Sequence, residues 1–399
     1  MKPSCARLTV GLALLGCSQG GGANPPPAGN VMDAATTPPP ADAGPATQPP
    51  DLGAGAAPTD APASDDPIPV ADAGSDSGSG GAPAGNARRE AFLAQLRGIV
   101  NPQPPLAPML MPAQTAGGVV VQDFSFSSTP TWRVPGTLRR PAAAAGRLPV
   151  GIVLHETGGD RTSGNVVAIA NALVARGFLT VAITGRNSVG GNGNYVQAMK
   201  DAYANPGHDY PFLYDTAWDV MRLIDYLVTR DDVDAARIGV TGVSKGGMET
   251  VLVAAADPRV AAAAPIIGVQ SFKWELENNA FQARAGSLGG AVPNANDAAS
   301  VRMFYDRVAP GLVDEFDGPD MVPLASPRPF IVIAGLQDPR NPMPSVQLVM
   351  TAATAAYARD GAADHLKLFT ANVGHDGGYA PFHTAAVDWL VQWLGTAKP

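Results

Sequence analysis

The sequence predicts an α/β fold in which a mostly parallel β-sheet is covered by helices on both faces. From about residue 149 onward, short continuous apolar runs alternate with segments that have the apolar spacing of helices. Because these runs are apolar at consecutive positions, we expect both faces of each strand to be buried, as in parallel sheets. Two earlier strand signals joined by a turn predict an antiparallel edge.

The elements are expected in a regular order along the chain. A helix over 88–100 precedes the two edge strands at 119–125 and 131–138. The alternating part that follows is expected to contain strands at 149–155, 178–183, 237–241, 260–267, 329–334 and 366–371, and helices at 165–176, 214–229, 248–256, 345–359 and 380–394.

Residues 270–326 interrupt this alternation, because they carry helical signals but no clear strand. We interpret them as a cap-like insertion over the strand ends, placed before the strand at 329–334. Trp274 lies in this insertion, at roughly helical spacing from Phe272 and Phe281. Packing in the core is the ordinary role of such residues, and the alternative is that Trp274 forms an apolar wall of a substrate site.

Residues 18–86 have a different composition from the rest of the chain. They contain 14 prolines and eight aspartates, but no lysine, arginine or aromatic residue. Such a segment buries too little apolar surface to offset its loss of conformational entropy, so we predict a disordered linker. Its acids account for the formal net charge of −8, so the domain predicted at 87–399 is nearly neutral and nucleic acid is not an expected partner.

The first 17 residues are typical of an export signal. A positively charged start precedes an apolar run over 8–16, which is too short to span a bilayer permanently. Leu14-Leu15-Gly16-Cys17 resembles the lipobox of bacterial lipoproteins, which implies a diacylglyceryl group on Cys17 and a lipid-anchored protein of the cell envelope. The alternative is an ordinary signal peptide with a chance cysteine. Ser18, which stands where an aspartate would signal retention, favours the outer membrane.

The pattern Gly242-x-Ser244-x-Gly246 stands between a strand signal and a helix signal. This arrangement is typical of a nucleophile elbow, a sharp turn that exposes a serine at the tip of a strand. Glycines are needed two residues before and after the serine because larger side chains would collide in so tight a turn. The alternative is a turn serine in a non-catalytic protein.

Two further residues could activate this serine. Asp338 follows the strand at 329–334 and His375 follows the last strand, so all three side chains are expected at the same edge of the sheet. A hydroxyl needs a base, and the base needs an acid that orients it. Asp376 is a rival acid that adjoins His375 and cannot easily orient its ring, and Asp320 in the insertion is a more distant rival.

An oxyanion hole needs two N–H donors. One is expected from the backbone of Lys245, at the start of the helix after Ser244. The other is expected from Thr157, in the loop after the strand at 149–155. The five histidines are scattered, and no cysteine cluster exists, so no metal site is predicted.

These motifs resemble the α/β-hydrolase superfamily, in particular its dienelactone hydrolase and acetyl xylan esterase-like branch. The resemblance covers about residues 115–397 and implies a Ser-Asp-His triad that cleaves esters, lactones or peptides without a cofactor. It also implies that His155 is structural. Glu156 stands where the family has a glycine, so its carboxylate is expected to point away from the oxyanion or to be paired.

The sequence therefore predicts an exported carboxylic ester hydrolase that acts on a small or polymer-borne ester. One alternative is a serine peptidase of the prolyl oligopeptidase type, although no β-propeller repeat precedes the domain. The other is a non-catalytic envelope lipoprotein that uses a hydrolase fold for binding.

Overall fold

The computed structural model describes residues 81–98, 103–188, 194–207 and 209–395, and all of them belong to one unit that runs from Asp76 to Pro399. The predicted signal peptide, Cys17 and the linker up to residue 80 lie outside the described residues. In the described ranges, no helix has both the length and the apolar character that a membrane span requires.

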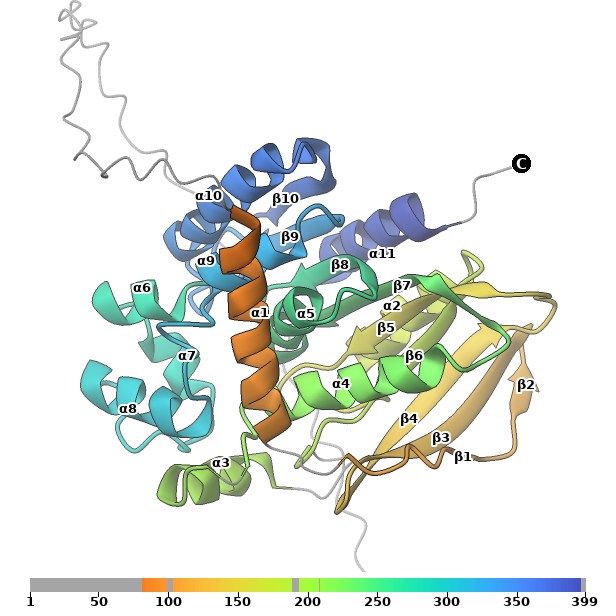
Figure 1. The fold of residues 1–399 in the computed structure, drawn as a ribbon, viewed down its shortest axis with the longest axis horizontal. Coiled ribbons are helices and arrows are strands. Elements are labelled where there is room, and N and C mark those ends of the chain that lie inside the picture. Colours follow the sequence, from red (N-terminus) through yellow and green to blue (C-terminus); the bar gives the residue numbers. More distant parts are fainter. Residues whose placement is uncertain (1–80, 99–102, 189–193, 208, 396–399) are drawn as a thin grey trace, which may run out of the picture. The chain divides into compact units, whose positions relative to one another are not determined.

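A mixed ten-stranded sheet forms the centre of this unit (Figure 1). Its strands lie in the order β1-β3-β4-β6-β5-β7-β8-β9-β10, and β2 pairs with β3. The strands are β1 (Met109–Leu110), β2 (Gln114–Ala116), β3 (Val119–Thr129), β4 (Trp132–Pro141), β5 (Leu148–Leu154), β6 (Leu179–Ile183), β7 (Val233–Val243), β8 (Val260–Ile266), β9 (Phe330–Gly335) and β10 (Leu366–Ala371).

The pairing confirms the predicted sheet. β3 and β4 are antiparallel to each other, and β4 is antiparallel to β6. All pairs from β6 through β10 are parallel. β1 and β2 were not predicted, because both are very short and exposed and therefore leave no apolar pattern in the sequence.

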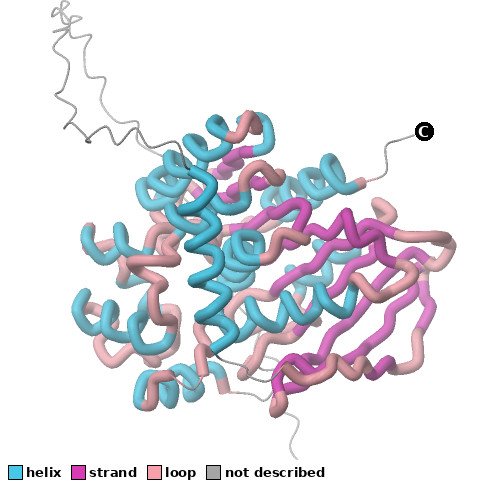
Figure 2. Tube along the Cα trace, viewed as in Figure 1, coloured by secondary structure: helices cyan, strands magenta, loops and turns pink. Residues whose placement is uncertain are grey.

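Helices cover both faces of the sheet, as Figures 1 and 2 show. α2 and α11 pack on one face, whereas α1, α4, α5 and α10 belong to the apolar cluster on the other. These helices are α1 (Gly81–Gly98), α2 (Gly164–Val174), α4 (Tyr214–Leu227), α5 (Lys245–Ala256), α10 (Met343–Arg359) and α11 (Ala380–Leu394).

The burial of the central strand β5 explains why its sequence is apolar at consecutive positions. All seven of its residues are buried. Ile152 belongs to the apolar cluster on one face and its neighbour Val153 to the cluster on the other. Neighbouring side chains of a strand point to opposite faces, so each such residue contributes about 1.5–3 kcal/mol from burial on its own side.

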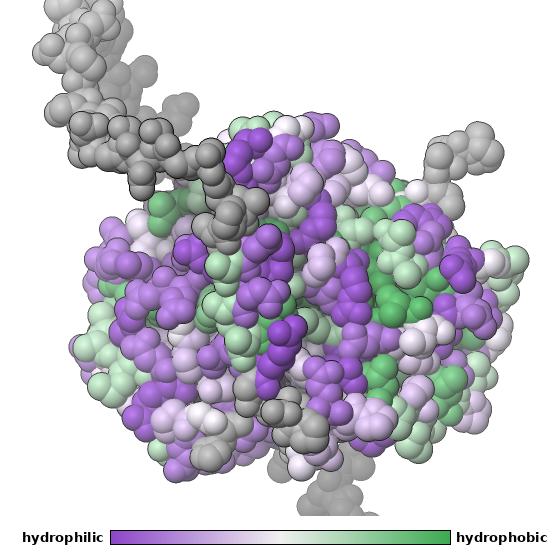
Figure 3. All heavy atoms as spheres, viewed as in Figure 1, coloured by the Kyte–Doolittle hydropathy of each residue, from purple (hydrophilic) through white to green (hydrophobic). Residues whose placement is uncertain are grey.

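α1 begins earlier than the sequence predicts. The helix starts at Gly81, so residues 81–86 are helical although they were assigned to the linker. Alanines in this stretch favour helix despite the glycines, and further along Phe92 and Leu96 bury the helix against the domain. Arg89 also donates to the carbonyls of Ala255 and Leu324, both at 2.8 Å. Hydrophilic side chains are prominent on the outer surface over this helix (Figure 3).

The insertion at 270–326 is helical, as predicted. Its elements are α6 (Phe272–Glu277), α7 (Gln282–Gly286), α8 (Ala298–Val308), α9 (Gly318–Met321) and a short 3-10 turn at Val322–Ala325. α8 contacts α3 (Tyr195–Ala204), a helix that was not predicted. Phe272 packs edge-on against Tyr305 with ring centroids 5.3 Å apart, and both rings also pack against Phe212, so the insertion is part of the apolar cluster of the domain.

Candidate active site

Ser244 lies in a sharp turn between β7 and α5. Its backbone has φ 55° and ψ −111°, a conformation that non-glycine residues rarely adopt. A Cβ added to Gly246 would lie 2.6 Å from the carbonyl oxygen of Leu154, and one added to Gly242 would lie 2.6 Å from the carbonyl of Gly246. Neither position has room for a side chain, so the structure contains the predicted elbow with its glycines.

The structure brings the three predicted side chains together in one hydrogen-bonded chain. His375 Nε2 is 2.8 Å from Ser244 Oγ, and His375 Nδ1 is 2.7 Å from Asp338 Oδ2. The carboxylate cannot donate, so Nδ1 carries the proton and Nε2 is left to accept from the serine hydroxyl. All three residues are buried.

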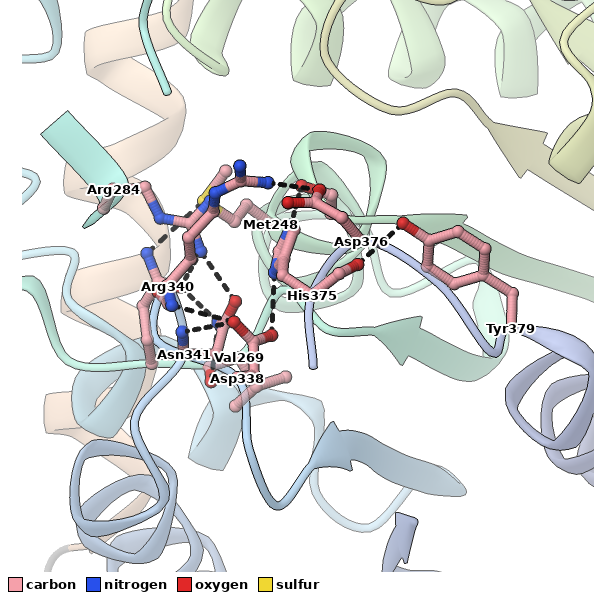
Figure 4. A network of polar contacts seen from close by, with 11 residues as sticks. Met248, Val269, Arg284, Asp338, Arg340, Asn341, His375, Asp376 and Tyr379 are labelled. Atoms are coloured by element: carbon pink, nitrogen blue, oxygen red, sulfur yellow. Dashed lines mark hydrogen bonds and ion pairs between the residues drawn. The ribbon is translucent and has the colours of Figure 1, made fainter. Parts of the chain in front are cut away.

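The loops that carry Asp338 and His375 are fixed by further polar contacts (Figure 4). Asp338 Oδ1 accepts the backbone N–H groups of Arg340 at 2.8 Å and Asn341 at 3.2 Å. Tyr379 donates its hydroxyl to the carbonyl oxygen of His375 at 2.6 Å. Oδ1 of Asp338 is therefore held by the backbone, and Oδ2 is available to accept from the imidazole of His375.

Burial is the main cause that lowers the pKa of His375 below its usual value of 6.5. The hydrogen bond to Asp338 acts in the opposite direction, and the nearby Arg284 cation lowers the pKa further. A lowered pKa leaves the imidazole neutral at pH 7, which is the form that can accept a proton.

Neither rival acid contacts the imidazole through its carboxylate. Asp376 forms an ion pair with Arg340 at 2.7 Å, and its side chain is 71% exposed. Asp320 forms an ion pair with Arg88 at 3.1 Å. The structure therefore favours Asp338 as the partner of His375.

The two expected oxyanion donors lie near the serine. Lys245 is the first residue of α5, and Thr157 lines the same cavity as Ser244. Neither backbone N–H has a hydrogen-bond acceptor in the part of the chain that the structure describes. The Lys245 side chain points elsewhere, into a buried ion pair with Glu249 beneath the ring of Tyr195.

His155 and Glu156 precede Thr157 in this loop. His155 is buried, its Nδ1 lies 2.8 Å from the carbonyl oxygen of Glu156, and its Nε2 accepts the N–H of Gly185 at 3.0 Å. Burial lowers its pKa to about 3, so it is a neutral structural residue, in agreement with the resemblance. The Glu156 carboxylate lies against Gly159, and its Oε2 is buried without a partner among the described residues. The expected pairing of Glu156 is therefore not found there.

A cavity of about 240 Å³ opens at the serine, and the residues that line it carry polar side chains. Its lining residues are Glu156, Thr157, Ser244, Ser287, Arg340, His375, Asp376 and Tyr379. Trp274 is not among them, because it lies on α6 while the insertion reaches the cavity through Ser287 at the end of α7. A larger cavity of about 400 Å³ near Arg186 and Asp215 contains no residue of the Ser-His-Asp chain.

Sequence reasoning did not assign three of these lining residues to the site. Arg340 and Tyr379 follow Asp338 and His375 by two and four residues, so their closeness to the predicted triad was an available signal. Ser287 carried no such signal, because its position depends on how the insertion packs. Among the described residues, no group of three or more histidine, cysteine, aspartate or glutamate side chains is arranged to hold a metal ion.

Comparison with known proteins places this geometry in context. A model of the prolyl oligopeptidase family matches residues 162–397. "Putative hydrolase YtaP" of Bacillus subtilis (strain 168) is 28% identical over 182 residues, which cover 44% of this chain and 52% of that protein. The chain therefore spans about half the length of this curated relative.

Two solved structures are similar in fold. "Methylesterase BT1017" gives a TM-score of 0.58 at 19% identity, covering 77% of this chain and 63% of its own. Acetyl xylan esterase 1 from Thermoanaerobacterium sp. JW/SL YS485 gives a TM-score of 0.55 at 18% identity, covering 76% of this chain and 93% of its own. At these identities the likeness supports the α/β-hydrolase fold alone.

Proposed function

Because the chain belongs to the prolyl oligopeptidase family of α/β-hydrolases, we propose that it is a serine hydrolase that cleaves carboxylic esters through an acyl-enzyme. The observation that carries this proposal is the buried Ser244–His375–Asp338 chain, with distances of 2.8 and 2.7 Å. Such distances suit proton transfer from the hydroxyl to the imidazole.

In the proposed reaction, Ser244 Oγ attacks the ester carbonyl while its proton passes to His375 Nε2. Asp338 holds the imidazole and stabilises its cation. The N–H groups of Lys245 and Thr157 bind the oxyanion, and losing one such donor typically costs about 3–4 kcal/mol of transition-state stabilisation. The carbon–oxygen bond to the alcohol then breaks, and His375 returns the proton to the leaving alcohol. Water, activated by the same histidine, hydrolyses the acyl-enzyme.

The cavity supports a short acyl group and a polar alcohol as the substrate class. Its volume of about 240 Å³ is small, and its lining carries charged and hydroxyl side chains rather than aliphatic ones. A long apolar acyl chain would gain little from such walls. The structural neighbours include an acetyl xylan esterase, so we propose an acetyl or similarly short ester of a hydroxyl-rich alcohol.

Peptide hydrolysis is a second candidate, because the matching family is named for a peptidase and the same residues could cleave an amide. A non-catalytic binding role is the third candidate, because Glu156 lines the same cavity as Ser244 and its buried Oε2 has no partner among the described residues, and a carboxylate that faced the oxyanion would oppose catalysis. Labelling by a serine-reactive fluorophosphonate distinguishes either enzyme from a binding protein. Rates on p-nitrophenyl esters and on peptide p-nitroanilides distinguish the two enzymes.

The decisive experiment measures hydrolysis of p-nitrophenyl acetate, butyrate and octanoate by the wild type and by Ser244→Ala. We expect acetate to be the best of the three substrates and the activity to disappear in the variant. Absence of activity on every ester, together with no fluorophosphonate labelling, would reject the hydrolase proposal.

We also propose that the protein is exported and anchored by a lipid on Cys17, in the cell envelope and with the outer membrane favoured. This rests on the sequence, because Cys17 lies outside the described residues. Metabolic labelling with a radioactive fatty acid tests it, and Cys17→Ala should abolish the label. Equal labelling of the variant would reject the anchor.

A further inference from the structure

Arg284, on α7 of the insertion, reaches from the insertion to the loop that carries Asp338. Its guanidinium is fully buried, and its Nη2 donates to Asn341 Oδ1 at 2.7 Å and to the carbonyl oxygen of Arg340 at 2.9 Å (Figure 4). A third contact joins the same nitrogen to Gln270 Oε1 at 2.7 Å. The side chain therefore links the insertion to the segment directly after the proposed catalytic acid.

The residues that Arg284 contacts are the same residues that hold Asp338. Asp338 Oδ1 accepts the backbone N–H groups of Arg340 and Asn341. The Asn341 side chain is completely buried, and its amide also donates to Gln270 Oε1 and to the carbonyl oxygen of Val269. Arg284 thus contacts both residues whose backbone N–H groups bind the Asp338 carboxylate.

The network continues to the nucleophile helix. Gln270 Nε2 is 3.5 Å from the sulfur of Met248, a weak contact to α5. The N–H of Met248 in turn donates to the carbonyl oxygen of Ser244 at 3.0 Å. The elements that carry the acid and the nucleophile therefore both touch the residues around Arg284.

We propose that Arg284 is a positioning residue, which acts from the insertion through Arg340 and Asn341 to hold Asp338 against His375. The inference rests on the proposed role of Asp338 as the catalytic acid. It also gives the insertion a part in organising the triad, in addition to its contribution to the cavity wall.

Stability alone explains this buried cation poorly. Burying a charged guanidinium away from water is costly, even where hydrogen bonds offset part of that cost. Arg284 Nε and Glu275 Oε1, both buried, have no hydrogen-bond partner among the described residues. A network that leaves buried polar atoms unpaired while it contacts Arg340 and Asn341 in the acid loop fits a role in geometry better than a role in stability.

The experiment compares Arg284→Gln and Arg284→Lys with the wild-type full chain. Three quantities are measured: kcat and KM on p-nitrophenyl acetate, thermal unfolding, and the low-field proton NMR signal of the His375 Nδ1–H that bonds to Asp338. A displacement of about 1 Å at a reacting group can cost about 100-fold in rate. We therefore expect kcat of Arg284→Gln to fall about 10- to 100-fold with KM within threefold, and the low-field signal to be lost or shifted. The kcat of Arg284→Lys should lie between those of the wild type and Arg284→Gln.

Arg328→Gln serves as the matched control. Arg328 is a partly buried arginine that also donates to backbone carbonyls, among them those of Ala254 and Val260, but it lies just before β9, at the strand end opposite Asp338. This variant should lower the unfolding temperature without changing kcat or the NMR signal.

A folded Arg284→Gln that keeps kcat within twofold and keeps the low-field signal would overturn the inference. If Arg284→Gln does not fold, kcat and the low-field signal are measured on Arg284→Lys instead, and a folded Arg284→Lys that keeps both would overturn the inference. If the wild type hydrolyses no ester, the proposed function fails, whereas the NMR signal still tests the inference because it needs no substrate.

Discussion

Replacing Asp338 by asparagine is the sharpest test of the proposed mechanism, because the structure predicts how the new amide would be oriented. Asp338 Oδ1 accepts two backbone N–H groups, and Oδ2 accepts the proton on His375 Nδ1. In Asp338→Asn the amide oxygen would stay with the two N–H donors, because the NH₂ group cannot accept hydrogen bonds. The NH₂ group would then face His375 Nδ1.

This orientation puts the imidazole in the wrong tautomer. His375 Nδ1 would have to accept from the NH₂ group, so its proton would move to Nε2, the atom 2.8 Å from Ser244 Oγ. A protonated Nε2 cannot take the serine proton. The same change in a Ser-His-Asp protease lowers kcat by about 10⁴-fold, which corresponds to about 5.4 kcal/mol of transition-state stabilisation.

The assay is steady-state hydrolysis of p-nitrophenyl acetate at pH 7.5, with thermal unfolding as a check on the fold. We expect kcat to fall about 10⁴-fold while KM and the unfolding temperature change little. Asp320→Asn is the control, because Asp320 pairs with Arg88 and does not contact His375. A loss of less than tenfold in Asp338→Asn, or an equal loss in the control, would refute the reasoning.

Four further outcomes are expected. Ser244→Ala should lower kcat by about 10⁵- to 10⁶-fold and abolish fluorophosphonate labelling; retained labelling would point to another nucleophile. Because burial lowers the pKa of His375, kcat/KM should rise with pH through an apparent pKa below 6.5 and level off by pH 7, and a rise that begins only above pH 7 would contradict this. Gly246→Ala should cost about 1–3 kcal/mol in urea unfolding, since its Cβ would lie 2.6 Å from a backbone oxygen, whereas Gly164→Ala, with open space around it, should be nearly neutral or stabilising. Burial raises the pKa of Glu275 to about 8 from an unfolded value near 4.5, so its contribution to stability is full below pH 4.5 and is lost as pH rises to 8. In urea unfolding, the stability of Glu275→Gln relative to wild type should therefore increase from pH 5 to pH 8. A difference in stability that stays constant over this range would contradict the raised pKa.

Local patterns in the sequence were enough to predict the order of the main elements. The parallel strands β5 and β9 are continuous apolar runs, because all of their residues are buried and both of their faces are covered. Ser244, Asp338 and His375 follow three of the parallel strands, and parallel strands end at the same edge of the sheet. That edge brings the three residues together although 131 positions separate the first from the last.

The insertion could be predicted only as a helical segment. Its helices are short, and their packing depends on contacts with residues far away in sequence, such as that between α8 and α3. Trp274, predicted from its type as a core residue or alternatively as a wall of the substrate site, does not line the cavity at Ser244, whereas Ser287 does. Glu156 was expected to be paired or to point away, and its buried oxygen has no partner within the described residues.

The sequence by itself determined the fold, the elbow glycines and the three residues at the strand ends, because strand burial and turn sterics act within a few neighbouring residues. The sequence favoured Asp338 over Asp376 as the acid, and only the tertiary structure shows the hydrogen bond of 2.7 Å between the two loops that joins Asp338 to the imidazole. The tertiary structure also decided that Arg284 contacts the loop that carries Asp338. Contacts between distant segments depend on the packing of whole side chains, and no local pattern in the chain records that packing.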